Sequence, residues 1–303
     1  MAVPDFQSFF LPLLKLSADG ETHSLKDSYT AMAEVFKLSD DDLAEMLPSG
    51  KQTTFKNRVA WANVYLAKAL LLERPKRGFF RITERGKELL RANPTTLRVK
   101  QLKEYSEFVD FHTTGNKQDK VIDTSSDDER TSTPEEVFES AYQELRNSLA
   151  SELHAHILSN TPEFFEHLVV KLLVEMGYGG SIKDAGRAMG RSGDEGIDGI
   201  IKEDKLGLDV IYIQAKRWQG SVGRPEVQKF VGALHGQRAK KGVFITTGNF
   251  TRDAEHYVST IDPKVVLIDG SRLVELMIDY NLGVSIADTY EIKKIDSDFF
   301  IEE

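Results

Sequence analysis

Two stretches decide the fold of the C-terminal half: Gly193-Asp194-Glu195-Gly196-Ile197-Asp198-Gly199-Ile200-Ile201 and Val210-Ile211-Tyr212-Ile213-Gln214-Ala215-Lys216-Arg217-Trp218. A short turn-like segment separates them. Both runs are rich in branched and aromatic residues, which favours two β-strands. Because side chains alternate along a strand, Gln214 and Lys216 should share one face. A hairpin centred at Leu206 would place Asp198 opposite Gln214. The pattern therefore predicts an acid, an amide and an amine close together.

This trio suits a hard divalent cation, Mg²⁺ or Mn²⁺, because such ions take few protein oxygens and share their shell with water and phosphate. Asp198 would supply a carboxylate, Gln214 a side-chain carbonyl and Ala215 a backbone carbonyl as metal ligands. Lys216 would orient the attacking water and stabilise the charge that develops on phosphorus. The alternative is an ordinary salt bridge on a strand face, worth about 0 to 1 kcal/mol when exposed.

The remainder of this half alternates between helical and strand patterns. Helices are expected at 162–176 and 225–237 and from Thr251 and Ser271, and strands near 180–183, 197–201, 210–216, 242–247 and 264–268. This order predicts an α/β domain with a mixed sheet flanked by helices. Neither GxGxxG nor GxxxxGK[ST] occurs, so a nucleotide-binding enzyme has no motif to support it.

The N-terminal region has a different pattern, with four helices followed by a hairpin. The helices are expected around 6–14, at 25–36, from Ser39 as N-cap, and at 53–70. Two β-prone runs then flank a basic tip at Lys76 and Arg77, and Thr83 caps a last helix. Residues 1–92 are typical of a mainly α-helical winged-helix domain, which either binds DNA or serves protein contacts.

Composition and charge narrow the function classes. A chain of 303 residues is long enough for about two domains of roughly 100 to 200 residues each. It has no cysteine, no apolar run of membrane-spanning length and no signal sequence at its start, so we expect a soluble cytoplasmic protein without a membrane partner. Thiolate chemistry and disulfides are excluded.

The charge is unevenly distributed along the chain. Although the net charge is -9, residues 49–103 hold 14 Lys/Arg against 3 Asp/Glu. Such a basic block is expected where a protein contacts phosphate groups. The expected DNA contacts are Lys56, Arg58 and Asn63 on the fourth helix, and Lys76 and Arg77 at the hairpin tip. A solvated helix face is the alternative.

The middle of the chain is polar and acidic. Residues 104–152 hold 13 Asp/Glu against 4 Lys/Arg, and turn-forming residues dominate up to Pro134. We therefore expect an acidic linker and a connector helix over 93–160, with that helix at 134–159. The catalytic domain would occupy 161–290, and 291–303 would be a tail.

Four phrases of the C-terminal half together resemble the Mrr family of modification-directed restriction endonucleases. They are Asp-Glu-Gly-Ile-Asp-Gly-Ile-Ile, Ile-Gln-Ala-Lys-Arg-Trp, Phe-Ile-Thr-Thr-Gly-Asn-Phe-Thr-Arg-Asp-Ala and Leu-Ile-Asp-Gly-Ser-Arg-Leu. The resemblance implies a restriction-endonuclease-like PD-(D/E)xK fold in the variant where Gln replaces the second acid. Asp198, Gln214 and Lys216 match that motif, whereas Ile197 stands in place of its proline.

Nucleases of this kind commonly use a further carboxylate from the first helix of the domain. Glu166 is the favoured candidate and Glu163 competes, because residues three apart share a helix face. Asp194 and Glu195 are additional acids in the loop before the first strand.

The resemblance implies a metal-dependent DNA endonuclease that restricts methylated foreign DNA. Since cleavage of both strands usually needs two active sites, a homodimer or higher homo-oligomer is expected. The competing hypothesis is a non-catalytic DNA-binding regulator that keeps a nuclease-like fold. The simultaneous presence of Asp198, Gln214 and Lys216 favours the enzyme.

Overall fold

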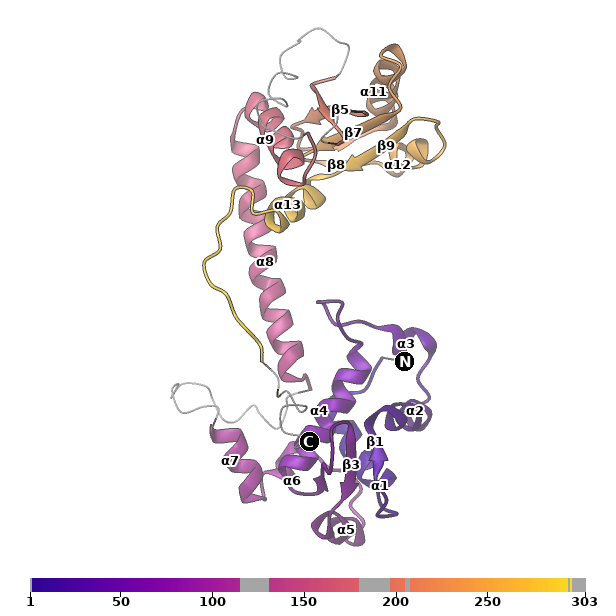
Figure 1. The fold of residues 1–303 in the computed structure, drawn as a ribbon, viewed down its shortest axis with the longest axis vertical. Helices are drawn as coiled ribbons and strands as arrows, with labels where there is room; N and C mark the ends of the chain where they lie inside the picture. The colour runs from indigo at the N-terminus through magenta and orange to yellow at the C-terminus, as the bar shows by residue number, and fades with distance from the viewer. Residues whose placement is uncertain (1, 115–130, 180–196, 205–207, 294, 296–303) are drawn as a thin grey trace. The chain divides into compact units, whose positions relative to one another are not determined.

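The computed structural model describes residues 2–114, 131–179, 197–204, 208–293 and 295 (Figure 1). The chain forms two compact units, Met1–Glu144 with Lys294–Glu303, and Leu145–Lys293. Each unit has a hydrophobic core of its own. In the described part of the chain, none of the helices is both long and apolar enough to cross a membrane.

The first unit is mainly helical, as its sequence predicts. Its elements up to residue 91 are η1 (Phe6–Phe9), α1 (Phe10–Leu16), β1 (His23–Ser24), α2 (Leu25–Phe36), α3 (Asp40–Ala44), α4 (Thr54–Lys68), β2 (Leu72–Glu73), β3 (Phe79–Ile82) and α5 (Glu84–Arg91). The expected hairpin is confirmed, since β2 and β3 pair antiparallel with Leu72 opposite Ile82. Strand β1 pairs on the other side of β3, which completes a sheet of order β1-β3-β2.

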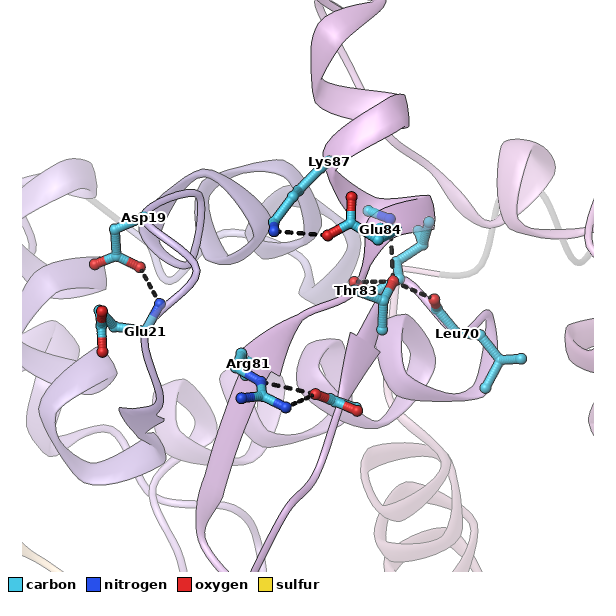
Figure 2. A network of polar contacts seen from close by, with 10 residues as sticks. Asp19, Glu21, Leu70, Arg81, Thr83, Glu84 and Lys87 are labelled. Atoms are coloured by element: carbon cyan, nitrogen blue, oxygen red, sulfur yellow. Dashed lines mark hydrogen bonds and ion pairs between the residues drawn. The ribbon is translucent and has the colours of Figure 1, made fainter.

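Local side-chain caps fix the helix starts. Ser39 and Asp42 form the expected capping box at α3. Thr83 caps α5 by accepting from the Gly86 amide, and its hydroxyl donates to the carbonyl of Leu70 at 2.6 Å (Figure 2). Thr83 therefore joins the start of α5 to the chain that enters β2.

The segment after residue 92 differs from the expected linker. It contains α6 (Val99–Leu102) and α7 (Ser106–Thr114). Leu97, Val99, Leu102 and Phe108 are buried in the core of the first unit. The linker expectation is therefore wrong for this stretch, because its apolar residues are the ones that complete the first core.

The second unit is an α/β structure around a mixed sheet. Its elements are α8 (Pro134–Ser159, which begins in the first unit), α9 (Pro162–Glu175), β4 (Gly199–Lys202), β5 (Val210–Lys216), β6 (Ser221–Val222), α11 (Arg224–Gly236), β7 (Lys241–Thr246), β8 (Asn249–Phe250), α12 (Arg252–Ser259), β9 (Lys264–Ile268) and α13 (Gly270–Asp279). The sheet order is β4-β5-β7-β9, with β4 antiparallel and the other strands parallel. The predicted mixed sheet flanked by helices is confirmed. The strand expected near 180–183 lies outside the described residues.

Helices cover the sheet on both faces (Figure 1). The end of α8 together with α9 and α13 packs on the face that carries Ile211 and Ile213. Helices α11 and α12 pack on the opposite face, against Tyr212 and Phe244. Because β7 is central in a parallel arrangement, its residues from Gly242 to Thr246 are buried. The C-terminal end of β5 is thus held on a rigid, two-sided support.

We predict that Gly86→Ala destabilises the first unit. An added Cβ would lie 2.3 Å from the carbonyl oxygen of Leu71 and 2.7 Å from Ile82 Cγ1. Overpacking of this kind typically costs about 1 to 3 kcal/mol. Urea denaturation would measure the loss. The matched control is Gly232→Ala within α11, where nothing lies within 4 Å, so this substitution should leave stability unchanged or raise it by up to about 1 kcal/mol. Equal stability of the two variants would contradict the prediction.

Candidate active site

The pairing of β4 with β5 places Asp198 beside Gln214. Gly199 lies opposite Ile213, and the Asp198 amide donates to the Ile213 carbonyl at 2.8 Å. The Asp198 carboxylate then accepts hydrogen bonds from the Ala215 amide at 2.8 Å and from the Gln214 side-chain amide. The register predicted from the sequence is therefore the one in the structure.

Lys216 ends β5 on the same face as Gln214. Its ammonium group forms an ion pair with Glu226 and lies 3.9 Å from the centroid of the Trp218 ring. Burial raises the pKa of Asp198, while the Ala215 amide and then the Lys216 ammonium act in the opposite direction. The Lys216 ammonium therefore lies within electrostatic range of Asp198 while Glu226 and Trp218 hold it.

Glu166, on α9, faces this site. Burial raises the pKa of Glu166, and the negative charges of Asp198 and then Glu163 raise it further. Glu163, by contrast, has a lowered pKa because its own backbone amide and the Thr161 hydroxyl donate to it. Its side chain thus stabilises the first turn of the helix. These opposite pKa directions favour Glu166 over Glu163 as the helix carboxylate.

The donors gathered here fit a hard divalent cation. Burial raises the pKa of Asp198 as well as that of Glu166, and the two carboxylates lie close enough to repel each other. A cation between them would relieve that repulsion, and amide and carbonyl oxygens are its usual further ligands. Among the described residues there is no cluster of three or more His, Cys, Asp or Glu of metal-binding type, so a full shell would also need Gln214, a backbone carbonyl, water or phosphate.

Sequence reasoning missed Glu226. It lies in the first turn of α11, where an acid is also favoured by the helix dipole. The available signal is the short connection from the end of β5 to Arg224: in a parallel crossover, the next helix starts near the C-terminal end of the strand.

The two residues that follow Lys216 in the sequence are held by hydrogen bonds at the end of β5. Arg217 donates to the carbonyl of Leu158 at 2.8 Å and so ties the end of α8 to β5. Trp218 exchanges hydrogen bonds with the Thr247 hydroxyl through both its amide and its carbonyl. Asp194 and Glu195 lie outside the described residues.

The expected DNA contacts of the first unit divide into two groups. Lys56, Lys76 and Arg77 are exposed, and the Lys76 ammonium lies 4.0 Å from the centroid of the Phe79 ring. These three cations are accessible to a ligand, as expected.

The other two residues correct the expectation of solvent-facing side chains. Asn63 is only 3% exposed, and its carbonyl accepts from Arg74 at 2.9 Å. Arg58 forms an ion pair with Glu136 at 2.7 Å and donates to the carbonyls of Val3 and Pro4. The helical spacing did not reveal this, because the partners come from the N-terminus and from the start of α8.

Comparisons with known proteins define the class. The family profile described as "Restriction endonuclease" matches residues 157–277, and the profile described as "Mrr N-terminal domain" matches residues 6–92. The C-terminal match contains Asp198, Gln214, Lys216, Glu166 and Glu226. The protein is therefore a restriction endonuclease, a hydrolase that cleaves DNA. Enzymes of this kind generally use divalent metal ions.

The chain belongs to the Mrr family. The type IV methyl-directed restriction enzyme EcoKMrr of Escherichia coli (strain K12) is 37% identical to it, over 99% of this chain and 100% of that protein. Among solved structures, the MspJI restriction endonuclease in complex with a 27-mer oligonucleotide is 26% identical over 54% of this chain and 36% of its own, with a TM-score of 0.31. The DNA modification-dependent restriction endonuclease AspBHI is 16% identical over 70% and 55%, with a TM-score of 0.35.

We predict that Asp198→Asn stabilises the metal-free protein at neutral pH. The pKa of Asp198 is higher in the folded than in the unfolded state. The metal-free fold therefore loses stability as the pH rises from the unfolded to the folded pKa, and above the folded pKa the ionised carboxylate is destabilising. The amide isostere removes that charge. In EDTA at pH 7, the variant should unfold at a higher Tm than wild type, by about 2 to 4 °C for each kcal/mol gained in the free energy of unfolding. Near pH 3.5 the difference in Tm should be much smaller.

Glu163→Gln is the control of opposite sign. Because the folded pKa of Glu163 lies below its unfolded value, its carboxylate stabilises the fold at neutral pH and loses this effect as the pH falls. This variant should lower the Tm at pH 7. If both variants shifted the Tm in the same direction, the electrostatic assignment would be wrong.

We predict that Glu226→Gln lowers kcat about tenfold, or about 1.4 kcal/mol of activation free energy, and leaves the KM for DNA unchanged. The substitution removes the charge that holds Lys216. Glu226→Asp should restore part of the rate. The control is Lys229→Ala, which removes the other cation paired with Glu226 and should retain full activity. A purely structural role of Glu226 would instead change the Tm without separating kcat from KM.

Proposed function

We propose that this protein is a Mg²⁺- or Mn²⁺-dependent endonuclease that restricts methylated DNA. The observation that carries the proposal is the convergence of Asp198, Gln214 and Lys216 at the end of the β4–β5 pair, with Glu166 facing them from α9. The methyl-directed activity of the 37% identical relative supports methylated duplex DNA as the substrate.

Asp198 and Glu166 would hold the cation, together with the side-chain oxygen of Gln214 and the Ala215 carbonyl. Gln214 directs its amide nitrogen to Asp198, which leaves the amide oxygen as the group available for a ligand. When bound, the cation supplies charge stabilisation for the phosphodiester oxygens and promotes deprotonation of water.

The residues of the chain itself position the reactants. Lys216 orients the attacking water and stabilises negative charge on the scissile phosphate by donating hydrogen bonds. Glu226 and Trp218 restrict where its ammonium group lies, which keeps the long side chain from sampling unproductive rotamers. The Ala215 amide holds the Asp198 carboxylate in position before DNA arrives.

DNA selection is assigned to the first unit. Its helix α4 and the β2–β3 hairpin correspond to the recognition helix and wing of a winged helix, and the excess of positive charge lies in residues 49–103. Lys56, Lys76 and Arg77 are the exposed candidates for phosphate contact. We further propose a homodimer or higher homo-oligomer, since two strands are cut most simply by two copies of the site.

We predict that Asp198→Ala and Lys216→Ala each abolish Mg²⁺-dependent cleavage of methylated plasmid while the fold and DNA binding stay largely intact, because both residues act in chemistry. Matched methylated and unmethylated plasmids, incubated with Mg²⁺ and separated on a gel, give the measurement.

Lys202→Ala, which changes an exposed lysine on the neighbouring strand β4, is the control and should cut normally. Cleavage by either active-site variant at the wild-type rate would remove the site assignment, and equal cleavage of both plasmids would remove the methyl specificity. If the wild type binds DNA but does not cut it, the hypothesis of a non-catalytic DNA-binding regulator is favoured instead.

A further inference from the structure

The first unit contains a cavity of about 640 Å³ between the C-terminal part of α4, strand β2 and the start of α5. Val64, Ala67, Leu70 and Leu72 give it an apolar floor. The charged groups of its lining come from Lys68, Glu73, Arg74, Glu84 and Arg85. Figure 2 shows part of this rim, where Leu70 meets Thr83.

Both acids of the lining, and one of its cations, are already neutralised. Glu73 pairs with Arg81 across the hairpin. Glu84 pairs with Lys87 at 2.8 Å, a contact that Figure 2 shows. Arg85 pairs with Glu107 at 2.9 Å, and this contact lowers the pKa of Glu107 to about 2. These ion pairs leave Lys68 and Arg74 as the remaining charges of the lining.

Neither of these two cations forms an ion pair within the described part of the chain. Among the described residues, the polar partner of Arg74 is the Asn63 oxygen, which accepts from its Nε at 2.9 Å, and partial burial lowers the pKa of the guanidinium. Lys68 lies 4.9 Å from the centroid of the Phe111 ring, which is an apolar partner for its charge. Arg74 is exposed, and because a guanidinium remains protonated in proteins, its charge is available to an anion.

Asn63 positions Arg74 from below the cavity lining. Because Arg74 can only donate, the oxygen of the Asn63 amide must face it, which fixes the amide nitrogen on the other side. That nitrogen is buried and, within the described residues, has no hydrogen-bond partner. Asn63 is not among the residues that line the cavity, so its contribution is to hold Arg74, and the case for a ligand rests on the two cations without ion pairs.

We propose that this cavity binds a phosphate group of the DNA backbone, with Arg74 and Lys68 as its charge partners. The proposal rests on the proposed function, because it takes duplex DNA as the ligand. The planar guanidinium matches two phosphate oxygens at once, and the apolar floor suits the adjoining deoxyribose. Such a contact fixes where the duplex lies on the first unit and carries no sequence information.

Anisotropy of a labelled duplex, with the full chain in EDTA to prevent cleavage, tests the site. Arg74→Ala should weaken binding about fivefold to tenfold at fixed salt and reduce the slope of log K against log salt by about 0.9, the value for one phosphate contact. Arg74→Lys should keep the slope. Lys15→Ala, an exposed cation on α1 outside the lining, is the matched control and should bind like wild type.

Arg74→Gln keeps a donor for the Asn63 oxygen without the charge, and it carries the test if Arg74→Ala fails to fold. Wild-type affinity and salt slope in a folded Arg74→Gln variant would overturn the proposal. A second arm compares the Tm in inorganic phosphate with that in chloride of equal ionic strength. If phosphate protects wild type but not Arg74→Gln, while the variant still binds DNA normally, the cavity takes free phosphate and the DNA assignment is overturned. If wild type binds no duplex, the proposed function is wrong, and the comparison of Tm values in phosphate and chloride alone tests the cavity. A rise of the wild-type Tm in phosphate that Arg74→Gln loses would support an anion site there. No rise of the wild-type Tm would overturn it.

Discussion

The hydrogen bond from the Asp198 amide to the Ile213 carbonyl is the constraint on which the active site depends. It sets the register of β4 on β5, and this register decides which side chains stand side by side at the end of the pair. A slip of one residue would move Asp198 away from Gln214 and turn it to the other face. The position of the central carboxylate is therefore a property of the sheet, and β7 supports it by pairing with the other edge of β5.

The charged groups around Asp198 and Lys216 are not balanced in the same way on both sides of the site. Burial disfavours the ionised forms of Asp198 and Glu166, and their proximity adds repulsion. On the other side, Lys216 is paired with Glu226, whose own pKa is lowered by Lys216 and then by Lys229. The site thus has a carboxylate half that gains from a cation and an ammonium half that is already balanced. That asymmetry distinguishes the proposed metal site from an ordinary strand-face salt bridge.

Much of this could be predicted from the sequence, because it depends on local rules. The alternation around Gln214 and Lys216 and the symmetry of the hairpin about its loop gave the correct register, and Ser39, Thr83 and the basic turn gave correct caps and hairpin. Contacts between distant segments could not be predicted in this way. Arg58 and Asn63 occupy positions that look exposed on a helical wheel, but Glu136 and Arg74 cover them. Glu226 approaches Lys216 only through the crossover from β5 to α11.

The attachment of the start of α8 to α4 has a consequence for how such proteins are assembled in evolution. Asn57, Arg58 and Trp61 bind Glu135 and Glu136 of α8, while residues 97–111 fill the first core. A gene fusion that exchanged the first unit at residue 92 would leave a core without its last helices and an arginine without its carboxylate. Modular exchange of the two units is therefore expected to join chains within α8, after Glu144, where a continuous helix tolerates a junction because its backbone hydrogen bonds are local.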